Sequence, residues 1–463
     1  MAPINDSALS ALRSELSPQA TISFPGDATY TTKRWARNAE KPAAVIICPA
    51  TSEDIVQILA FVQGKGAYSA QEKLDFAVKS GGHSPSGASS LEGGLVIDLQ
   101  PNMHGVRIDP DDKLAYVKGG SVWGEVDEAS IQYSLAAVAG TVNHTGVGGS
   151  ATVVTASGDI LTASDCENQE LFWAIRGGGG NFGVVTEFVY RLHEQRPDVY
   201  TATLIYPGAL VEPLFNELNA WMKERTILEN VLVVFAIGPG DQPVMIVQLV
   251  YNGDSEEGAR KFERFVKLGP FVNQAETLPY VKLNGMMNHH APPGENRLFR
   301  GNFIPETPNG VPVSLAAGLL NSLVDMVNKH PAAKKSMAFV ELYHPAKLAS
   351  VASNATAYPH RDPSFNVLFI TNWSEDSFSG KVPDNLRAWD RVFMDLRSEH
   401  FAPELIAQGG YTNYLDEDSQ MASNGVANRR FGSNFPRLAE AKRKYDPNNL
   451  FSKWFPIMAA PTA

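Results

Sequence analysis

The chain contains little cysteine, has no excess of positive charge and has no long hydrophobic run. Its 463 residues include only 2 cysteines, Cys48 and Cys166, too few for a disulfide framework or a cysteine-based metal site. The formal net charge of −11 disfavours nucleic acid and anionic membranes as partners. No stretch is long enough to span a bilayer, and residues 1–16 lack the apolar core of a signal peptide. We therefore expect a cytoplasmic protein.

What the chain does contain is a change of pattern near Arg196. Residues 41–193 alternate short strands with turns and one or two helices, which predicts an α+β domain. Beyond that point the expected strands are longer and lie at 201–206, 231–237, 245–251, 337–343 and 366–373. Amphipathic helices are expected at 209–225, 256–268, 313–330 and 385–400. This order predicts an antiparallel sheet with helices on one face.

A glycine-histidine segment, Lys79-Ser80-Gly81-Gly82-His83-Ser84, lies between two apolar runs. This pattern predicts a strand, a tight glycine turn and a second strand. Adjacent glycines allow successive backbone N–H groups to point at one place, which suits phosphate oxygens. A histidine there would lie against the ligand. The alternative is a hairpin turn with a solvated histidine.

A second glycine-rich segment covers residues 171–186 and contains four consecutive glycines at 177–180, followed by an expected strand. Such a run costs backbone entropy and suits a place where the backbone passes close to a ligand. The alternative is a flexible surface loop. The aromatic residues Phe172, Trp173 and Phe182 argue against that alternative, because loop tips are usually polar.

Together and in this order, the two segments resemble the flavin-dependent oxidases of the vanillyl-alcohol oxidase type, berberine-bridge-enzyme-like branch. Similar matches follow at residues 49–55, 115–124, 140–149, 411–414 and 444–451. The resemblance implies a two-domain FAD-binding fold of the PCMH type with an inserted substrate domain. Its expected parts are an FAD-binding domain at 1–195 (core about 41–193), a substrate-binding domain at 196–403, and a segment at 404–463 that returns to the FAD domain.

The resemblance also implies FAD, held covalently through His83. Val142 stands where doubly linked relatives carry a cysteine, so a single bond is expected. The other cofactor contacts implied in this way are Lys79, Ser80, Gly81, Gly82, Ser84, Thr145, Gly146, Gly148, Gly149, Gly183, Val184, Val185 and Asn413.

The expected catalytic base is Tyr414, because in relatives the tyrosine after this asparagine lies near flavin N5. We interpret the residues from Tyr411 to Tyr414 as a strand, with Tyr411 and Asn413 on one face. A phenol has a pKa of about 10, so Tyr414 needs a helper group that the sequence does not identify. The alternative is an ordinary strand tyrosine.

Several other polar residues have less specific interpretations. Glu341 alternates with apolar neighbours and faces either a cavity or solvent. His289-His290 lack further ligands at metal spacing, so a surface or pocket role is favoured, and His360-Arg361 resemble a family segment beside the substrate. Asp98 and Arg176 are expected to be structural.

The leading functional hypothesis is oxidation of a secondary-metabolite or sugar-like small molecule by hydride transfer to flavin N5. Oxygen is the expected acceptor, giving hydrogen peroxide. The alternative is a non-redox cyclase or isomerase, or a flavin-poor inactive homologue. One departure matters: Gly149 and Ser150 adjoin where relatives carry a further helix-sized stretch. We expect a more open flavin site at this junction. A dehydrogenase is a further alternative to an oxidase, because the missing stretch influences oxygen access.

Overall fold

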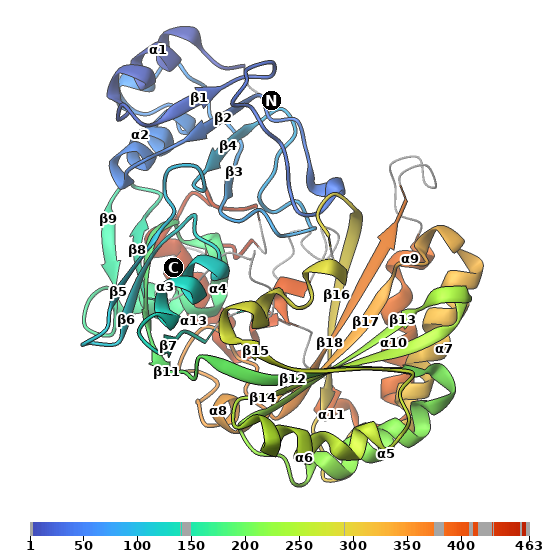
Figure 1. Ribbon diagram of the computed structural model, residues 1–463. Coiled ribbons are helices and arrows are strands. Elements are labelled where there is room, and N and C mark those ends of the chain that lie inside the picture. Colours follow the sequence, from blue (N-terminus) through green and yellow to red (C-terminus); the bar gives the residue numbers. More distant parts are fainter. Residues whose placement is uncertain are drawn as a thin grey trace.

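The computed structural model describes residues 3–138, 140, 150–290, 292–374, 384–406, 411–414, 428, 430–453 and 456–459. The described residues form three main sheets (Figure 1). Within them, no helix is both long and apolar enough to cross a membrane.

The first sheet has four strands and is mostly parallel. Its order is β1 (Thr21–Ser23), β2 (Val45–Cys48), β4 (Leu95–Asp98) and β3 (Phe76–Lys79). Strands β2, β4 and β3 run parallel, and β1 is antiparallel to β2. Helices α1 (Asp6–Glu15) and α2 (Ser52–Val62) share its apolar core. A capping box between Thr51 and Asp54 starts α2 directly after β2.

The second sheet has five antiparallel strands. Its order is β5 (Val106–Asp109), β6 (Leu114–Lys118), β10 (Val184–Arg191), β8 (Ser150–Val154) and β9 (Ile160–Ala163). Helices α3 (Trp123–Ile131), α4 (Gln169–Gly178) and α13 (Phe435–Tyr445) accompany it, and β7 (Leu135–Ala136) pairs with β11 (His193–Glu194). The strand expected after the glycine run is confirmed as β10.

The third sheet has seven antiparallel strands. Its order is β15 (Val272–Pro279), β12 (Asp198–Pro207), β14 (Pro243–Tyr251), β13 (Glu229–Ile237), β17 (Met337–Leu342), β18 (Ser364–Trp373) and β16 (Asn296–Pro305). The main helices beside it are α5 (Val211–Met222), α6 (Ser255–Val266), α7 (Val313–Lys329) and α10 (Trp389–Ser398). Short helices are α8 (Ala346–Ala349), α9 (Asp384–Arg387) and α11 (Pro403–Ile406). The prediction of an antiparallel sheet with helices on one face is confirmed, but it missed β15 and β16.

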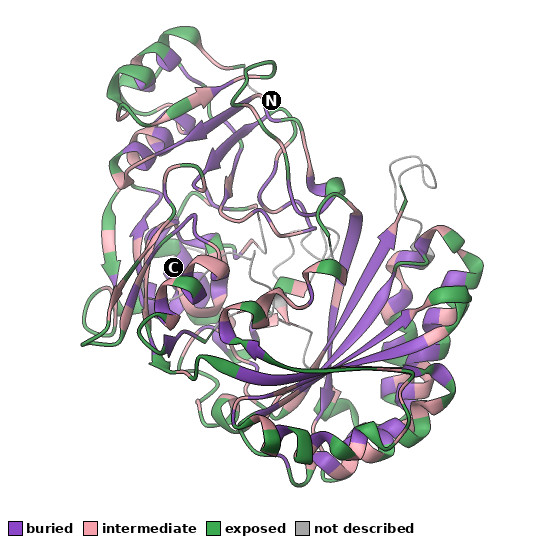
Figure 2. Ribbon diagram, in the orientation of Figure 1, coloured by how far each residue is buried: buried purple, intermediate pink, exposed green. Residues whose placement is uncertain are grey.

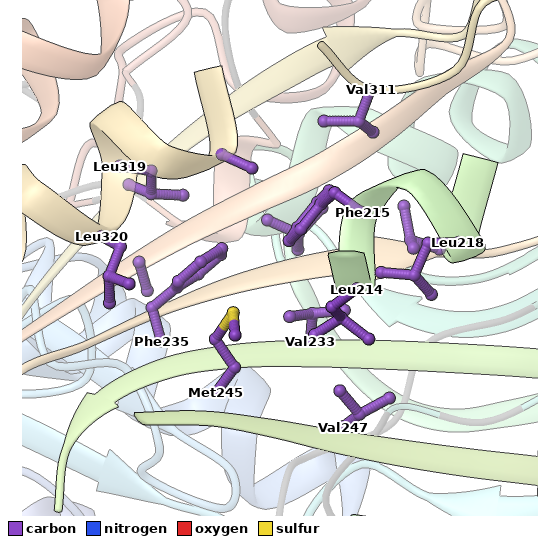
Figure 3. Close-up of a cluster of buried hydrophobic side chains, with 14 of the residues drawn as sticks. Leu214, Phe215, Leu218, Val233, Phe235, Met245, Val247, Val311, Leu319 and Leu320 are labelled. Carbon is purple, nitrogen blue, oxygen red and sulfur yellow. The ribbon is translucent and has the colours of Figure 1, made fainter. Parts of the chain in front are cut away.

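Strand alternation divides the seven-stranded sheet into two apolar faces. On β13, Val233 and Phe235 belong to the core under the helices, whereas Leu232 and Val234 belong to the cluster on the other face. Figure 3 shows Phe215 of α5 and Leu319 of α7 near strand residues of this helix-side core. The strands other than the edge strand β15 are largely buried, and the outer helix surfaces are exposed (Figure 2).

The second face of this sheet meets the N-terminal part of the chain. Trp35, Ala36 and Ala39 join its apolar cluster. Ala36 forms an isolated bridge with Glu295, and the Arg37 N–H donates to the Glu295 carbonyl at 2.9 Å. Figure 1 shows the end of β16 beside loops that leave the four-stranded sheet. This face is therefore where the two parts of the protein meet.

The C-terminal segment ties the glycine run to the rest of the fold. Lys442 of α13 donates to the Asn181 carbonyl at 2.7 Å and to the Phe451 carbonyl at 2.8 Å. It also pairs with Asp446, whose carboxylate accepts from the Phe451 N–H at 2.8 Å. The signature at residues 444–451 is thus a packing element that closes the chain onto its N-terminal half.

Candidate active site

The glycine-histidine segment does not form the tight turn that we expected. Strands β3 and β4 are parallel, so residues 80–94 cross from the end of one strand to the start of the next. This connection is irregular, and most of its residues are buried or half-buried. Gly82 adopts a φ of +68°, which favours glycine, and a Cβ there would press on Arg34 and Lys79. The loop therefore begins at the carboxyl end of a parallel strand, where open α/β sheets place their ligands.

The loop presents backbone donors. Within the described part of the chain, the N–H groups of Gly81, Gly82 and Ser84 donate to no protein acceptor. The Ser80 hydroxyl instead donates to the Gly119 carbonyl at 2.7 Å and fixes the start of the loop. Successive backbone N–H groups without a protein acceptor suit anionic oxygens.

The strand residues below this loop form an ion pair. The Lys79 ammonium lies 2.9 Å from the Asp98 carboxylate, and both side chains are buried. Asp98 also accepts the Gln100 N–H at 3.2 Å, as expected for a residue that caps nearby backbone. The positive charge of Lys79 is thus balanced by Asp98 within the protein. We therefore interpret Lys79 as a residue that packs under the loop at Gly82.

The start of β10 lies next to the same loop. The Gly119 N–H donates to the Thr186 carbonyl at 2.8 Å, and a Cβ on Gly119 would collide with the Val185 carbonyl. Because Ser80 binds Gly119, the structure brings the predicted residues 183–185 beside the glycine-histidine loop.

Tyr414 does not lie on a strand. Residues Thr412–Tyr414 form a 3-10 turn, and the Tyr414 N–H donates to the Tyr411 carbonyl at 2.9 Å. The turn brings the rings of Tyr411 and Tyr414 to 5.1 Å, and Asn413 is exposed with its amide on the Tyr411 hydroxyl at 2.6 Å. The strand prediction was wrong because a four-residue polar and aromatic pattern does not distinguish an extended segment from a turn.

The structure offers Glu341 as a candidate for the helper that the sequence left unnamed. Its carboxylate accepts the Tyr414 hydroxyl at 2.8 Å and the Asn366 amide at 2.9 Å. Glu341 on β17 lies directly opposite Asn366 on β18, on the face that carries Phe339. Only 4% of Glu341 is exposed, so of its two alternatives it faces the buried interior.

The electrostatics of this pair favour one shared proton. Burial raises the pKa of the Glu341 carboxyl. Burial, followed by the Glu341 charge, raises the pKa of the Tyr414 phenol well above its ordinary value. Tyr414 therefore keeps its proton at neutral pH, and a negative charge on both groups of the pair at once is disfavoured.

A run of rings connects the two predicted functional residues. The His83 imidazole stacks on the Trp35 indole with centroids 4.1 Å apart. Trp35 meets Phe299 at 5.5 Å, and Phe299 meets Tyr414 at 6.1 Å. The structure thus brings the histidine loop and the Tyr414-Glu341 pair to the same face of the seven-stranded sheet.

The remaining histidines do not form a metal site in the described part of the chain. His289 and His290 lie in a 3-10 turn with rings 3.8 Å apart, and burial together with His289 lowers the pKa of His290 to about 4. His360 is buried between Phe303 and Tyr358, at 5.4 Å from each ring. It belongs to the same aromatic region as Tyr411, whose ring lies 6.2 Å from Tyr358.

The first two residues of the four-glycine run, Gly177 and Gly178, approach protein, whereas we expected an approach to a ligand. Gly177, with a φ of +137°, passes against the Tyr358 backbone, and a Cβ on Gly178 would meet Phe182 and Leu438. The Arg176 guanidinium packs on the Phe172 ring and donates to the Phe172 carbonyl at 3.1 Å. Close packing of helix, loop and C-terminal segment explains Gly177 and Gly178, whereas a Cβ on Gly180 would meet nothing within 4 Å.

Arg176→Ala should therefore lower stability and flavin content before it changes chemistry. The variant loses one hydrogen bond, one cation–π contact and a long, exposed ion pair with Asp165 at 3.9 Å, a cost of about 1–2 kcal/mol. Thermal unfolding and flavin per protein measure this directly. A stable, fully flavinated Arg176→Ala protein without turnover would show that the residue has a catalytic role.

Comparison with known proteins identifies the family to which the chain belongs. The family described as FAD binding domain matches residues 43–159, and the family described as berberine and berberine like matches residues 410–454. The FAD-linked oxidoreductase pgmH of Aspergillus terreus is 30% identical over 463 aligned residues, which cover 92% of this chain and 90% of the relative. The chain belongs to the berberine-bridge-enzyme-like FAD-linked oxidoreductases.

Solved structures confirm the fold of this oxidoreductase. A variant of berberine bridge enzyme bound to (S)-reticuline superposes with a TM-score of 0.81 at 19% identity, covering 99% of this chain and 100% of that one. A xylooligosaccharide oxidase from Myceliophthora thermophila, bound to xylobiose, gives 0.77 at 21% identity, covering 98% and 100%. The oxidoreductase thus has the α+β, FAD-binding fold that the sequence predicted.

The described residues fit FAD as cofactor. The loop after β3 offers backbone N–H donors of Gly81, Gly82 and Ser84 to anionic oxygens, which a pyrophosphate supplies. The other expected contacts Thr145, Gly146, Gly148 and Gly149 lie outside the described residues, as does Val142. The prediction of an open site at the Gly149-Ser150 junction therefore stays a prediction.

Sequence reasoning missed three side chains of the candidate site, namely Trp35, Phe299 and Arg297. All are buried on the same sheet face or against it. Trp35 lies far from any glycine motif along the sequence, and β16 was not predicted because Arg297 and Gly301 interrupt its apolar pattern. A Cβ on Gly301 would lie 2.6 Å from the Tyr414 Cβ, so this glycine makes room for the 3-10 turn.

Proposed function

We propose that this oxidoreductase oxidises a small-molecule substrate by hydride transfer, with molecular oxygen as final acceptor and hydrogen peroxide as product. The observation that carries the proposal is the ring contact from His83 through Trp35 and Phe299 to Tyr414. It puts a candidate cofactor attachment point and a candidate base in one buried layer. FAD, when bound, supplies a two-electron acceptor at its N5 atom.

Tyr414 and Glu341 act as a proton relay in this proposal. Tyr414 takes the proton of a substrate hydroxyl or amine while its own phenol proton moves to the Glu341 carboxylate, 2.8 Å away. Asn366 holds the second carboxylate oxygen and fixes the carboxylate plane. The relay removes the need for a free phenolate, which the raised pKa of Tyr414 forbids near neutral pH.

The substrate class in the proposal is a secondary metabolite or a sugar-like molecule. The solved structures of this fold include one with (S)-reticuline and one with xylobiose, so the scaffold accommodates both ring types. Tyr358, Tyr411 and His360 give the region beside Tyr414 aromatic faces with polar edges. Such faces pack against flat apolar rings and against the C–H faces of sugars.

FAD is proposed to be attached through His83 alone. Holding the isoalloxazine through an imidazole nitrogen prevents loss of the cofactor and raises its potential. His83→Ala should keep the fold, release its flavin on denaturation and oxidise substrate more slowly. Flavin fluorescence of the denatured pellet, compared with that of the supernatant, measures attachment.

A single experiment tests the function as a whole. The purified protein is examined for flavin absorbance before and after acid precipitation, and peroxide is then measured on a panel of phenolic alkaloids and oligosaccharides. A yellow protein that makes peroxide supports the proposal. A folded, colourless protein that rearranges a substrate without oxygen uptake would favour the cyclase or isomerase alternative.

A further inference from the structure

We propose that Trp35 is a positioning residue for covalent attachment of FAD at His83, an inference that rests on the proposed function. The indole and imidazole planes lie 15° apart with centroids separated by 4.1 Å, which is a stacked pair. A stacked ring cannot tilt out of its plane by partial rotation about the Cβ–Cγ bond without losing that contact. Trp35 thus sets the plane in which the imidazole nitrogens lie.

The backbone of Trp35 is fixed from two sides. Its N–H donates to the Gly82 carbonyl at 3.1 Å, so Trp35 is tied to the residue before His83. Its carbonyl accepts the Gly294 N–H at 2.9 Å, and the following residue, Ala36, bridges Glu295. Trp35 therefore joins the histidine loop to the beginning of β16.

The indole itself is also held in place. Trp35 is 6% exposed, and the Arg297 guanidinium lies 4.0 Å from its ring centroid. Arg297 is fully buried and donates to Asn372 at 3.0 Å and to Glu295 at 3.1 Å. Hydrogen bonds to Asn372 and Glu295 thus hold the Arg297 guanidinium against the indole, and this contact restrains the Trp35 ring that stacks on His83.

Attachment needs such rigidity because of its chemistry. A C–N bond forms between the imidazole nitrogen and the 8α-methyl carbon, and one methyl C–H bond and the imidazole N–H bond break. The two electrons and two protons released reduce the flavin ring, which molecular oxygen reoxidises to give hydrogen peroxide. Bond formation requires the nitrogen within about 3–3.5 Å of the carbon along the correct line, and misplacement by about 1 Å can cost roughly 100-fold in rate.

The test follows attachment separately from turnover. Full-length protein produced under riboflavin limitation is mixed with FAD, samples are denatured at intervals, and covalent flavin is read as fluorescence of the protein band. Total bound flavin and the unfolding temperature are measured in parallel. The variants are Trp35→Leu, which removes the stack, and Trp35→Phe, which keeps an aromatic face. Trp389→Leu is the matched control, because Trp389 is a buried tryptophan of α10 in the helix layer.

Trp35→Leu should attach FAD about 10- to 100-fold more slowly than wild type. Trp35→Phe should recover most of the rate, and Trp389→Leu should attach FAD normally even where its unfolding temperature falls. Attachment by Trp35→Leu at the wild-type rate, or equal slowing in Trp389→Leu, would overturn the positioning role alone. A wild-type protein that releases all of its flavin would overturn the proposed link at His83 and, with it, this inference.

Discussion

Glu341→Gln is expected to lower kcat by about 10²- to 10⁴-fold, the usual contribution of a positioned acid or base. The amide keeps the shape of the side chain and can still accept the Tyr414 hydroxyl, but it cannot take up the relayed proton. Tyr414→Phe should cause a loss of similar size. Because the two residues form one relay, the double variant should be little worse than either single one. Flavin reduction by substrate without oxygen measures this step directly.

The pH profile provides a second readout of the same pair. Burial raises the pKa of Glu341, and the relay needs the carboxylate, so kcat/KM should rise with pH through that raised pKa. The effect on stability has the opposite sign. The folded protein holds this proton more tightly than the unfolded chain, so the stability that the group contributes is present at low pH and is lost as pH rises through the unfolded pKa toward the folded one. Glu341→Gln should therefore be at least as stable as wild type at neutral pH.

The matched control for these variants is Tyr206→Phe. Tyr206 is buried in the helix-side core, on the opposite side of the sheet, and donates to the Phe265 carbonyl at 2.8 Å. This variant should lose about 1 kcal/mol of stability and keep full turnover. A Glu341→Gln protein with wild-type kcat and an unchanged acid limb would remove Glu341 from the mechanism.

The second large expected effect is a loss of stability when the buried ion pair of Lys442 and Asp446 in the C-terminal segment is broken. Lys442 and Asp446 are both 0% exposed and lie 2.6 Å apart. Lys442→Met should destabilise the fold by about 3–5 kcal/mol, because it leaves the Asp446 carboxylate buried without its cation. It also removes the donor to the carbonyl of Asn181, which directly follows the glycine run, so flavin content should fall with stability. Thermal unfolding at a fixed flavin concentration measures both.

Lys267→Met is the matched control for that substitution. Lys267 and Glu263 form the same i,i+4 type of pair at 2.7 Å, but both side chains are more than half exposed. Exposed pairs of this type contribute about 0.3–0.5 kcal/mol, so this variant should unfold close to wild type. Equal destabilisation by the two substitutions would mean that burial of Lys442 is not what makes its pair important.

The sequence by itself determined the fold class, the order of most elements and the family. Alternation and helical spacing are local properties, so strands β12, β13, β14, β17 and β18 and their helices were predicted near their observed positions. Strand β15 is polar and exposed along one edge, and β16 is broken by Arg297 and Gly301, so neither carries the usual signal. The glycine-histidine motif also predicted the loop, although not its parallel crossover.

Only the tertiary structure decided which side chains meet. Alternation told us that Glu341 shares a face with Phe339, but both faces of this sheet are apolar, so nothing local distinguished the interior from solvent. The contact of Glu341 with Tyr414 spans 73 residues, and that of His83 with Trp35 spans 48. These partners meet because the N-terminal segment and the 3-10 turn both pack on the same face of the seven-stranded sheet, and packing between distant segments leaves no periodic pattern in either of them.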